Sequence, residues 1–106
     1  MGNAQATAED VVRLEGVLDG RHAPAVRAAL YETLASVRHG GTCTVDLSAA
    51  TLVDLTVLRA VAVASRHAER AGVHVVLRGG PAAVRRCVQL SGLGRWLRWD
   101  RSDSAA

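Results

Sequence analysis

The sequence predicts an α/β domain in which crossover helices join the parallel strands of one central sheet. Segments with apolar residues at every second position alternate with segments whose apolar residues recur at helical spacing. Glycine-containing turns mark the boundaries between these segments. The predicted order of elements is strand, helix, strand, helix, strand, helix, strand. A chain of 106 residues is long enough for one domain with a single hydrophobic core.

The first half of the chain is expected to hold a tail, a strand, a helix and a second strand. Residues 1–10 begin with small and polar side chains, which predicts a flexible tail. The next elements are a strand in 11–20 that ends at Asp19-Gly20, a helix in 22–41 with Pro24 in its first turn and Gly40-Gly41 as its stop, and a strand in 42–48. Their inward-facing residues are Val12, Leu14, Gly16 and Leu18, then Val26, Leu30, Leu34 and Val37, then Cys43, Val45 and Leu47.

The second half is expected to add two helices and two strands. They are a helix over 54–70 closed by Gly72, a strand in 73–79, a helix in 81–92 with Pro81 in its first turn, and a short strand in 96–100 before a flexible tail, 101–106. The apolar stripes of the two helices contain Val57, Val61, Ala64 and Ala68, and Val84 and Val88. Because the early strands alternate in character, we expect a mixed central sheet with helices mainly on one face.

Composition narrows the class of protein. No apolar run approaches the length of a membrane span and no signal layout precedes residue 10, so a cytoplasmic protein without membrane insertion is expected. The net charge is only +3 and aromatic residues make up 3%, which argues against direct nucleic-acid binding. All 13 basic residues are arginine, which leaves open an arginine-rich face for an acidic protein partner. Cys43 and Cys87 are expected to be reduced, small core residues.

Catalysis is not indicated. The sequence has no GxGxxG, P-loop, HExxH or GxSxG motif, and its four histidines lie apart from any suitably spaced carboxylate. Asp46 and Asp54 fall near expected strand ends, but two carboxylates without a third ligand make a poor metal site. We therefore expect no enzyme activity, no cofactor and no metal.

The stretch "TLVDLTVLRA", residues 51–60, is the most informative part of the sequence. Asp54 is expected to cap a helix, which places Leu55 at the first and Thr56 at the second helical position. The Thr56 hydroxyl would then lie at the positive end of the helix dipole, where a phosphate is favoured and Arg59 shares its face. The alternative is that Thr56 is an ordinary structural residue of a helix start.

The chain resembles the STAS domain, the family named for sulfate transporters and anti-sigma factor antagonists. The resemblance covers residues 11–100 and rests on "VVRLEGVLDG", "CTVDLSAATLVDLTVLRAV", "AGVHVVLRGG" and "AVRRCVQLSGLGRWL". In that family a strand ending in Asp-Leu-Ser is followed by Asp-Ser-Ser-Gly-Leu at a helix start, and "VDLS" and "VDLTVL" occupy those places here. The resemblance implies a STAS-like α/β fold.

The resemblance also implies a function in bacterial transcription regulation. Stand-alone members are anti-sigma factor antagonists that sequester a partner which is both anti-sigma factor and serine/threonine kinase, and that partner phosphorylates the second hydroxyl residue of the motif. Thr56 matches the phosphorylated residue and Asp54 the family aspartate. The residues expected to bind the partner are Asp54, Leu55, Thr56, Val57, Leu58 and Arg59.

Two alternatives stay open. Leu55 and Val57 replace the serine and glycine of the family motif, which favours a constitutive, non-phosphorylated interaction or scaffold domain. Such a domain could partner a lipid-transport or stressosome-like complex. The other alternative is a small-molecule binder that uses a groove beside Asp54. The sequence leaves the oligomeric state open between a monomer and a weak dimer.

Overall fold

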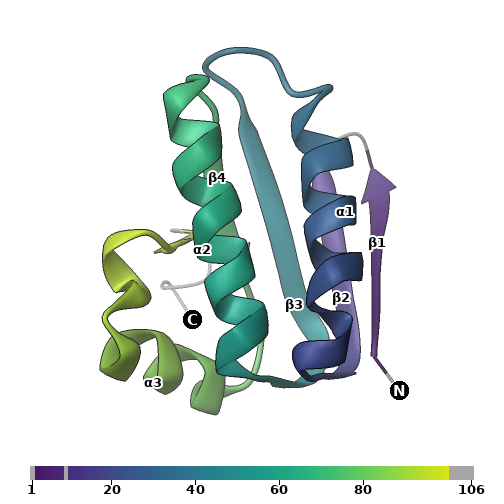
Figure 1. Cartoon of the computed structure of the whole chain (residues 1–106), viewed down its shortest axis with the longest axis vertical. Helices are drawn as coiled ribbons and strands as arrows, with labels where there is room; N and C mark the ends of the chain where they lie inside the picture. Colours follow the sequence, from purple (N-terminus) through teal and green to yellow (C-terminus); the bar gives the residue numbers. More distant parts are fainter. Residues whose placement is uncertain (1, 9, 101–106) are drawn as a thin grey trace.

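Three α-helices lie against one five-stranded sheet in the computed structural model, which describes residues 2–8 and 10–100 (Figure 1). The strands are β1 (Asn3–Ala8), β2 (Val11–Leu18), β3 (Thr42–Val53), β4 (His74–Arg78) and β5 (Arg98–Trp99). The helices are α1 (Ala23–Leu34), α2 (Leu55–Arg70) and α3 (Ala82–Ser91), with single 3-10 turns η1 (Gly20–His22) and η2 (Leu93–Arg95). The strands lie in chain order across the sheet. β1 is antiparallel to β2, and the later pairs are parallel.

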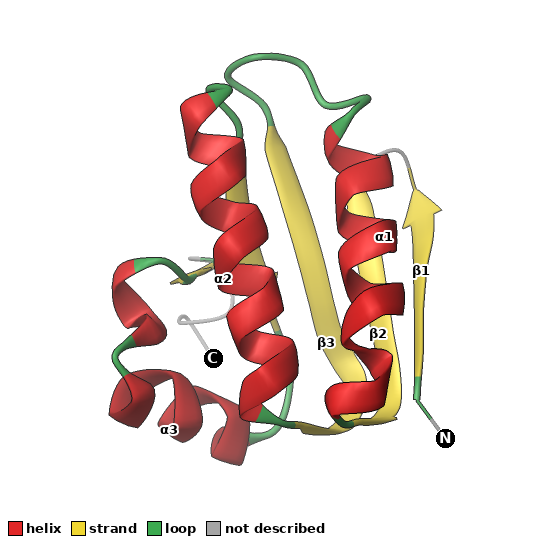
Figure 2. Cartoon of the chain, viewed as in Figure 1, coloured by secondary structure: helices red, strands yellow, loops and turns green. Residues whose placement is uncertain are grey.

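The strand order explains why the helices gather on one face. Each of the three helical connections moves the chain by one strand in the same direction across the sheet. Because such crossovers are right-handed, repeated steps in one direction place their helices on the same side. Figure 2 shows α1 and α2 side by side over the middle strands, with α3 next to α2. The predicted mixed sheet with helices mainly on one face is confirmed.

The core lies between the sheet and its helices, as the two periodicities predict. Residues at every second position of the strands and every third or fourth position of the helices turn toward it. The buried set includes Val12, Leu14, Leu18, Val26, Leu30, Cys43, Val45, Leu47, Val57, Val61, Ala64, Ala68, Val84 and Val88. Leu34 and Val37 only border the core, because α1 ends at Leu34, well before Gly40-Gly41.

Strand β3 continues to Val53, beyond the expected end at residue 48. Its buried positions change spacing after Leu47, with Ala50 and Val53 the next side chains in the core. The pairing with β2 shifts register at the same places, between Arg13 and Glu15 and again after Gly16. Bulges of this kind add a residue to one strand and break the period of two that the sequence prediction relied on.

The expected flexible tail over residues 1–10 is wrong for Asn3–Ala8, which form β1 at the edge of the sheet. Ala4 packs against the core, and a side chain at Gly2 would collide with the carbonyl oxygen of Val17. The segment has little apolar surface of its own. Its strand conformation comes from pairing with β2, which a local reading of the sequence does not detect.

The C-terminal strand is shorter than the strand expected in 96–100. β5 contains Arg98 and Trp99, whereas Trp96 follows η2. Both tryptophans are partly buried against the core, as a position near the last strand predicts. The predicted tail 101–106 lies outside the described residues. Over the described parts of the chain, no helix combines the length and the apolar character needed to cross a bilayer.

Candidate functional site

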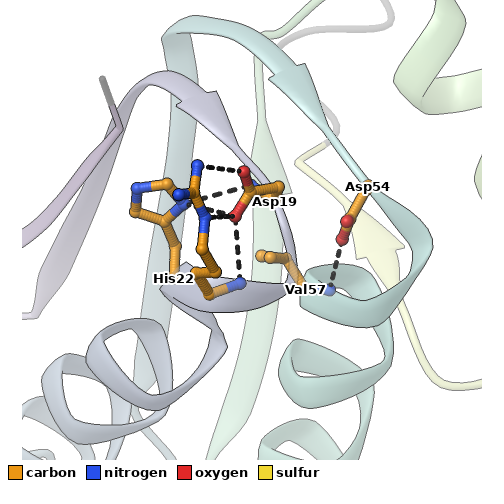
Figure 3. Close-up of polar contacts among 5 residues, drawn as sticks. Asp19, His22, Asp54 and Val57 are labelled. Atoms are coloured by element: carbon orange, nitrogen blue, oxygen red, sulfur yellow. Dashed lines mark hydrogen bonds and ion pairs between the residues drawn. The ribbon is translucent and has the colours of Figure 1, made fainter.

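Asp54 is the single residue that joins the end of β3 to the start of α2, and hydrogen bonds hold this joint in place (Figure 3). The Asp54 carboxylate accepts a hydrogen bond from the backbone N–H of Val57 at 3.0 Å, which confirms the predicted cap. The Asp54 amide donates to the carbonyl of Leu18 at 3.0 Å. One residue therefore satisfies an orphan donor of the helix and also attaches the joint to the end of β2.

Thr56 is exposed in the first turn of α2, as predicted. Its side chain lies over Gly20, where an added Cβ would come within 3.7–3.9 Å of the Thr56 side-chain atoms. A long side chain at position 20 would therefore crowd the hydroxyl. The site is formed by two segments, the start of α2 and the turn after β2, which are far apart in the sequence.

The turn after β2 is held by its own polar contacts (Figure 3). The Asp19 carboxylate accepts from the backbone N–H and from the guanidinium of Arg21, both at 2.9 Å. The hydrogen bond from the Arg21 side chain is the largest influence, and it lowers the pKa of Asp19 to about 2. Nδ1 of His22 lies 3.1 Å from the Asp19 amide nitrogen and 3.2 Å from the Asp19 carboxylate. These contacts fix the backbone that lies under Thr56.

The structure divides the six predicted partner-binding residues into two groups. Thr56 and Arg59 are exposed, and Asp54 and Leu55 are partly exposed. Val57 and Leu58 have 0% and 1% of their surface exposed, so their expected place on the docking surface is wrong. They belong to the core-facing stripe of α2, because their positions in the helix turn them toward the sheet.

An apolar groove beside the joint was not predicted from the sequence. It has a volume of about 440 Å³ and lies where the first turn of α2 meets α3. Leu55 lines one side, and Cys87, Leu90 and Arg86 line the other. Leu90 has 81% of its surface exposed, more than any other large apolar side chain in the described residues. The groove reaches α2 at Leu55, the residue before Thr56, and its side chains suit an apolar contact.

One residue of this groove, Leu90, could have been noticed in the sequence. Val84 and Val88 form the buried stripe of α3, and Leu90 lies two positions after Val88, off that stripe. A single exposed apolar residue is common, but Leu90 lines the same groove as Leu55, and a contiguous apolar surface indicates a contact with something outside the core. The approach of Gly20 to Thr56 had no such signal, because it depends on how distant segments pack.

Positive charge is concentrated in the half of the chain that follows the joint. Residues 55–99 contain eight arginines and one acidic residue, Glu69. Arg59, Arg66, Arg70 and Arg86 are exposed on α2 and α3. The Arg66 guanidinium lies 4.4 Å from the ring centre of Trp96, which keeps part of this charge beside an aromatic surface.

The acidic residues named as possible metal ligands do not come together. The Asp46 carboxylate accepts from the Ser48 hydroxyl at 2.6 Å and from Arg78 at 3.3 Å, far from the cap at Asp54. Burial raises the pKa of Asp46, but the hydrogen bonds from Ser48 and Arg78 outweigh it and leave the pKa below its usual value. Across residues 2–8 and 10–100, no group of three possible metal ligands is present.

Comparison with known proteins identifies the family. A family model described as "Mlab, STAS domain" matches residues 1–98, so the chain belongs to this STAS family. An anti-sigma factor antagonist from Mycobacterium paratuberculosis is 26% identical with a TM-score of 0.65, over 99% of this chain and 90% of that one. No protein of curated function matches the sequence.

Two structures of SpoIIAA share the fold at lower identity. The unphosphorylated anti-sigma factor antagonist is 18% identical with a TM-score of 0.67, over 99% of this chain and 92% of that one. The phosphorylated form, a Bacillus cell fate determinant, is 18% identical with a TM-score of 0.64, over 99% and 96%. The predicted STAS-like fold is therefore confirmed.

Proposed function

We propose that this protein is an anti-sigma factor antagonist controlled by phosphorylation of Thr56. It binds and sequesters a bacterial partner that is both anti-sigma factor and serine/threonine kinase. The observation that supports this best is the exposed Thr56 at the start of α2, which lies over Gly20 and directly follows Leu55, a residue of the apolar groove. The similarity to the mycobacterial anti-sigma factor antagonist supports the same class of function. In the cytoplasm the partner binds ATP and transfers its γ-phosphate, and Thr56 of this chain accepts that phosphate.

The unphosphorylated surface suits a partner with apolar and acidic side chains. Leu55 and Leu90 offer apolar contacts, and Arg59 and Arg86 place positive charge next to them. Such a combination of a desolvated apolar centre with charged neighbours is common in protein interfaces. Val57 and Leu58 support this surface from within the core instead of contacting the partner.

Phosphorylation would change that surface at its centre. The Thr56 oxygen bonds to the γ-phosphorus of the kinase-bound ATP while the bond from that phosphorus to ADP breaks. The hydroxyl proton passes to a base of the kinase, and a phosphate ester is left on the chain. The phosphate adds about −1.5 to −2 charges at neutral pH. The amides of the first turn and Arg59 stabilise this anion on the chain, while Leu55 next to it loses its fit to an apolar partner surface. The partner is then released.

The direct test uses the candidate kinase encoded nearest to this gene. The protein is incubated with that kinase and ATP, and phosphopeptides are located by mass spectrometry. We expect phosphate on Thr56, acceptance by Thr56→Ser, and none at this position in Thr56→Ala. Thr51→Ala is a matched control, because Thr51 is also exposed but lies in β3 outside the site.

Binding measurements complete the test. Isothermal titration should show that Thr56→Glu weakens the complex with the kinase, whereas Thr51→Glu leaves it intact. Absence of phosphate on Thr56, together with unchanged binding by Thr56→Glu, would rule out the switch.

The second candidate is a constitutive STAS interaction domain in a larger complex, such as a lipid-transport or stressosome-like assembly. Two observations favour it: the matching family model is described as Mlab, and Leu55 lies half-buried where the family motif has a serine. This candidate predicts binding that is insensitive to Thr56→Glu but lost on Leu90→Asp. The two candidates therefore differ in the response of one variant.

A further inference from the structure

The two edges of the sheet differ in how they are protected. β5 forms one edge, contains only two residues, and carries exposed Arg98 whose guanidinium lies 3.9 Å from the Glu69 carboxylate. A short, charged edge of this kind resists pairing with another strand. β1 forms the other edge with six residues, Asn-Ala-Gln-Ala-Thr-Ala, that include neither charge nor proline. In Figure 1, β1 is the outermost element on its side of the molecule.

The free hydrogen-bonding groups of β1 can be assigned from its neighbours. The Thr44 amide donates to the Asp10 carbonyl at 2.9 Å, so the backbone groups of Asp10 face β3. Backbone groups alternate sides along a strand, which directs those of Arg13 toward β1. Gln5 lies opposite Arg13, so its own amide and carbonyl face β2. The residues on either side of Gln5 therefore present their amides and carbonyls outward.

We propose that β1 pairs antiparallel with β1 of a second copy of this chain, about a two-fold axis at Gln5. In that register Ala4 lies opposite Ala6 of the second copy and exchanges two hydrogen bonds with it, and the symmetric pair exchanges two more. Gln5 lies opposite Gln5 of the second copy at a position without backbone bonds, where side chains approach closely and amides can bond each other. The result is one continuous sheet across both copies.

The sequence of β1 favours pairing with β1 of a second copy, because the side chains of this strand are compatible with those of an identical strand. Ala4 and Ala6 are small, so they leave space on the helix-covered side where two molecules would approach. The exposed Asn3 and Gln5 place uncharged, hydrogen-bonding side chains on the other side. No like charges meet within residues 3–8. The contact is limited to one strand pair with small side chains, so the dimer is weak and depends on concentration.

The experiment is sedimentation equilibrium of the full chain over about 10 μM to 1 mM. We expect a reversible dimer. Ala6→Pro removes an outward amide without touching the bonds to β2, and should raise the dissociation constant about tenfold or more. Gln5→Lys sets two positive charges across the axis, and should weaken the dimer most at low salt. Gln5→Thr is the matched control, because threonine suits a cross-strand pair and should preserve the dimer.

Two further measurements make the outcome decisive. Circular dichroism establishes that each variant is folded, and Gln5→Lys still tests the interface if Ala6→Pro is not. Amide NMR signals of residues 3–8 should shift with concentration, while those of α3 stay constant. A monomer over the whole range would overturn the proposal and leave a strand of another protein as occupant of the edge. A dimer of unchanged affinity in both Ala6→Pro and Gln5→Lys would also overturn it.

Discussion

Asp54 and Thr56 lie two residues apart in the same turn, yet they make different contributions to stability. The Asp54 carboxylate caps α2 by accepting from the Val57 amide, whereas the described contacts assign no hydrogen bond to the exposed Thr56 hydroxyl. Asp54→Ala should therefore lower the free energy of unfolding by about 1 kcal/mol. Thr56→Ala should change it by less than about 0.5 kcal/mol. Urea denaturation of both variants measures the difference, and equal losses would mean that Thr56 is structural.

The depressed pKa of Asp19 predicts a specific response to acid. Its carboxylate is favoured in the folded state, where the pKa is about 2, compared with an ordinary value of 3.8. A group of this kind stabilises the fold above its unfolded pKa, and the contribution disappears as pH falls from about 4 to about 2. A carbon-13 NMR titration should give a midpoint near 2 for Asp19. Arg21→Ala should raise that midpoint part of the way, because the backbone amide of residue 21 still donates to Asp19.

Local contacts were predictable from the sequence at this scale, and distant ones were not. The Asp54 cap depends on residues three positions apart, so the order of residue types was enough to predict it. The contact between Thr56 and Gly20 depends on how α2 packs beside the end of β2. The residue types of Asp19-Gly20 predict only the end of a strand. Its role as the floor of the site required the fold.

Helix α2 and helix α3 each have one face in the core and one at the surface, and stability should follow that division. Leu58 has 1% of its surface exposed, so Leu58→Ala leaves a cavity and should cost about 2–5 kcal/mol. Leu90 is 81% exposed, and Leu90→Ala should stay within about 0.5 kcal/mol. Thermal and urea unfolding provide both values. A large loss on Leu90→Ala would show that Leu90 is part of the fold, and would remove it from the proposed docking surface.

The elements with strong periodicity were predicted in the right order, although α1 ends at Leu34 and not near Gly40-Gly41. The full lengths of β1 and β3 depend on strand pairing and were not predicted. The stripe from Val57 to Ala68 defines α2, and the alternation of Cys43, Val45 and Leu47 defines the first part of β3. The continuation of β3 to Val53 escaped prediction because bulges interrupt its period. β1 escaped because its residues form a strand only beside β2. Both errors concern sheet contacts, which have no local signature of their own.

At the scale of the whole molecule, the order of elements and the handedness of crossovers explain most of the architecture. Sequential parallel strands joined by right-handed connections place the helices on one face, and this arrangement was predictable from the order of elements in the sequence. The angle at which α3 meets α2 has no such rule, so the groove between Leu55 and Leu90 required the structure. The fold was therefore more predictable than the surface on which the proposed function depends.

The central position of β3 makes Cys43 a reporter of global unfolding. Cys43 is fully buried in a strand paired on both sides, and burial, with a smaller contribution from Asp10, raises the pKa of its thiol to about 11. Cys87 is partly exposed in the groove between α2 and α3. At pH 8, iodoacetamide should therefore modify Cys87 in the folded protein. Cys43 should react only at the rate at which the whole molecule opens.

Mass spectrometry of timed samples distinguishes the two thiols. Modification of Cys43 should accelerate in urea in step with the loss of circular dichroism, while Cys87 reacts at all concentrations. Cys87→Ser provides the matched control, because it leaves Cys43 as the single thiol without changing the central strand. Rapid modification of Cys43 in native buffer would mean that β3 opens locally. In that case the sheet could not hold the start of α2 as rigidly as the proposed site requires.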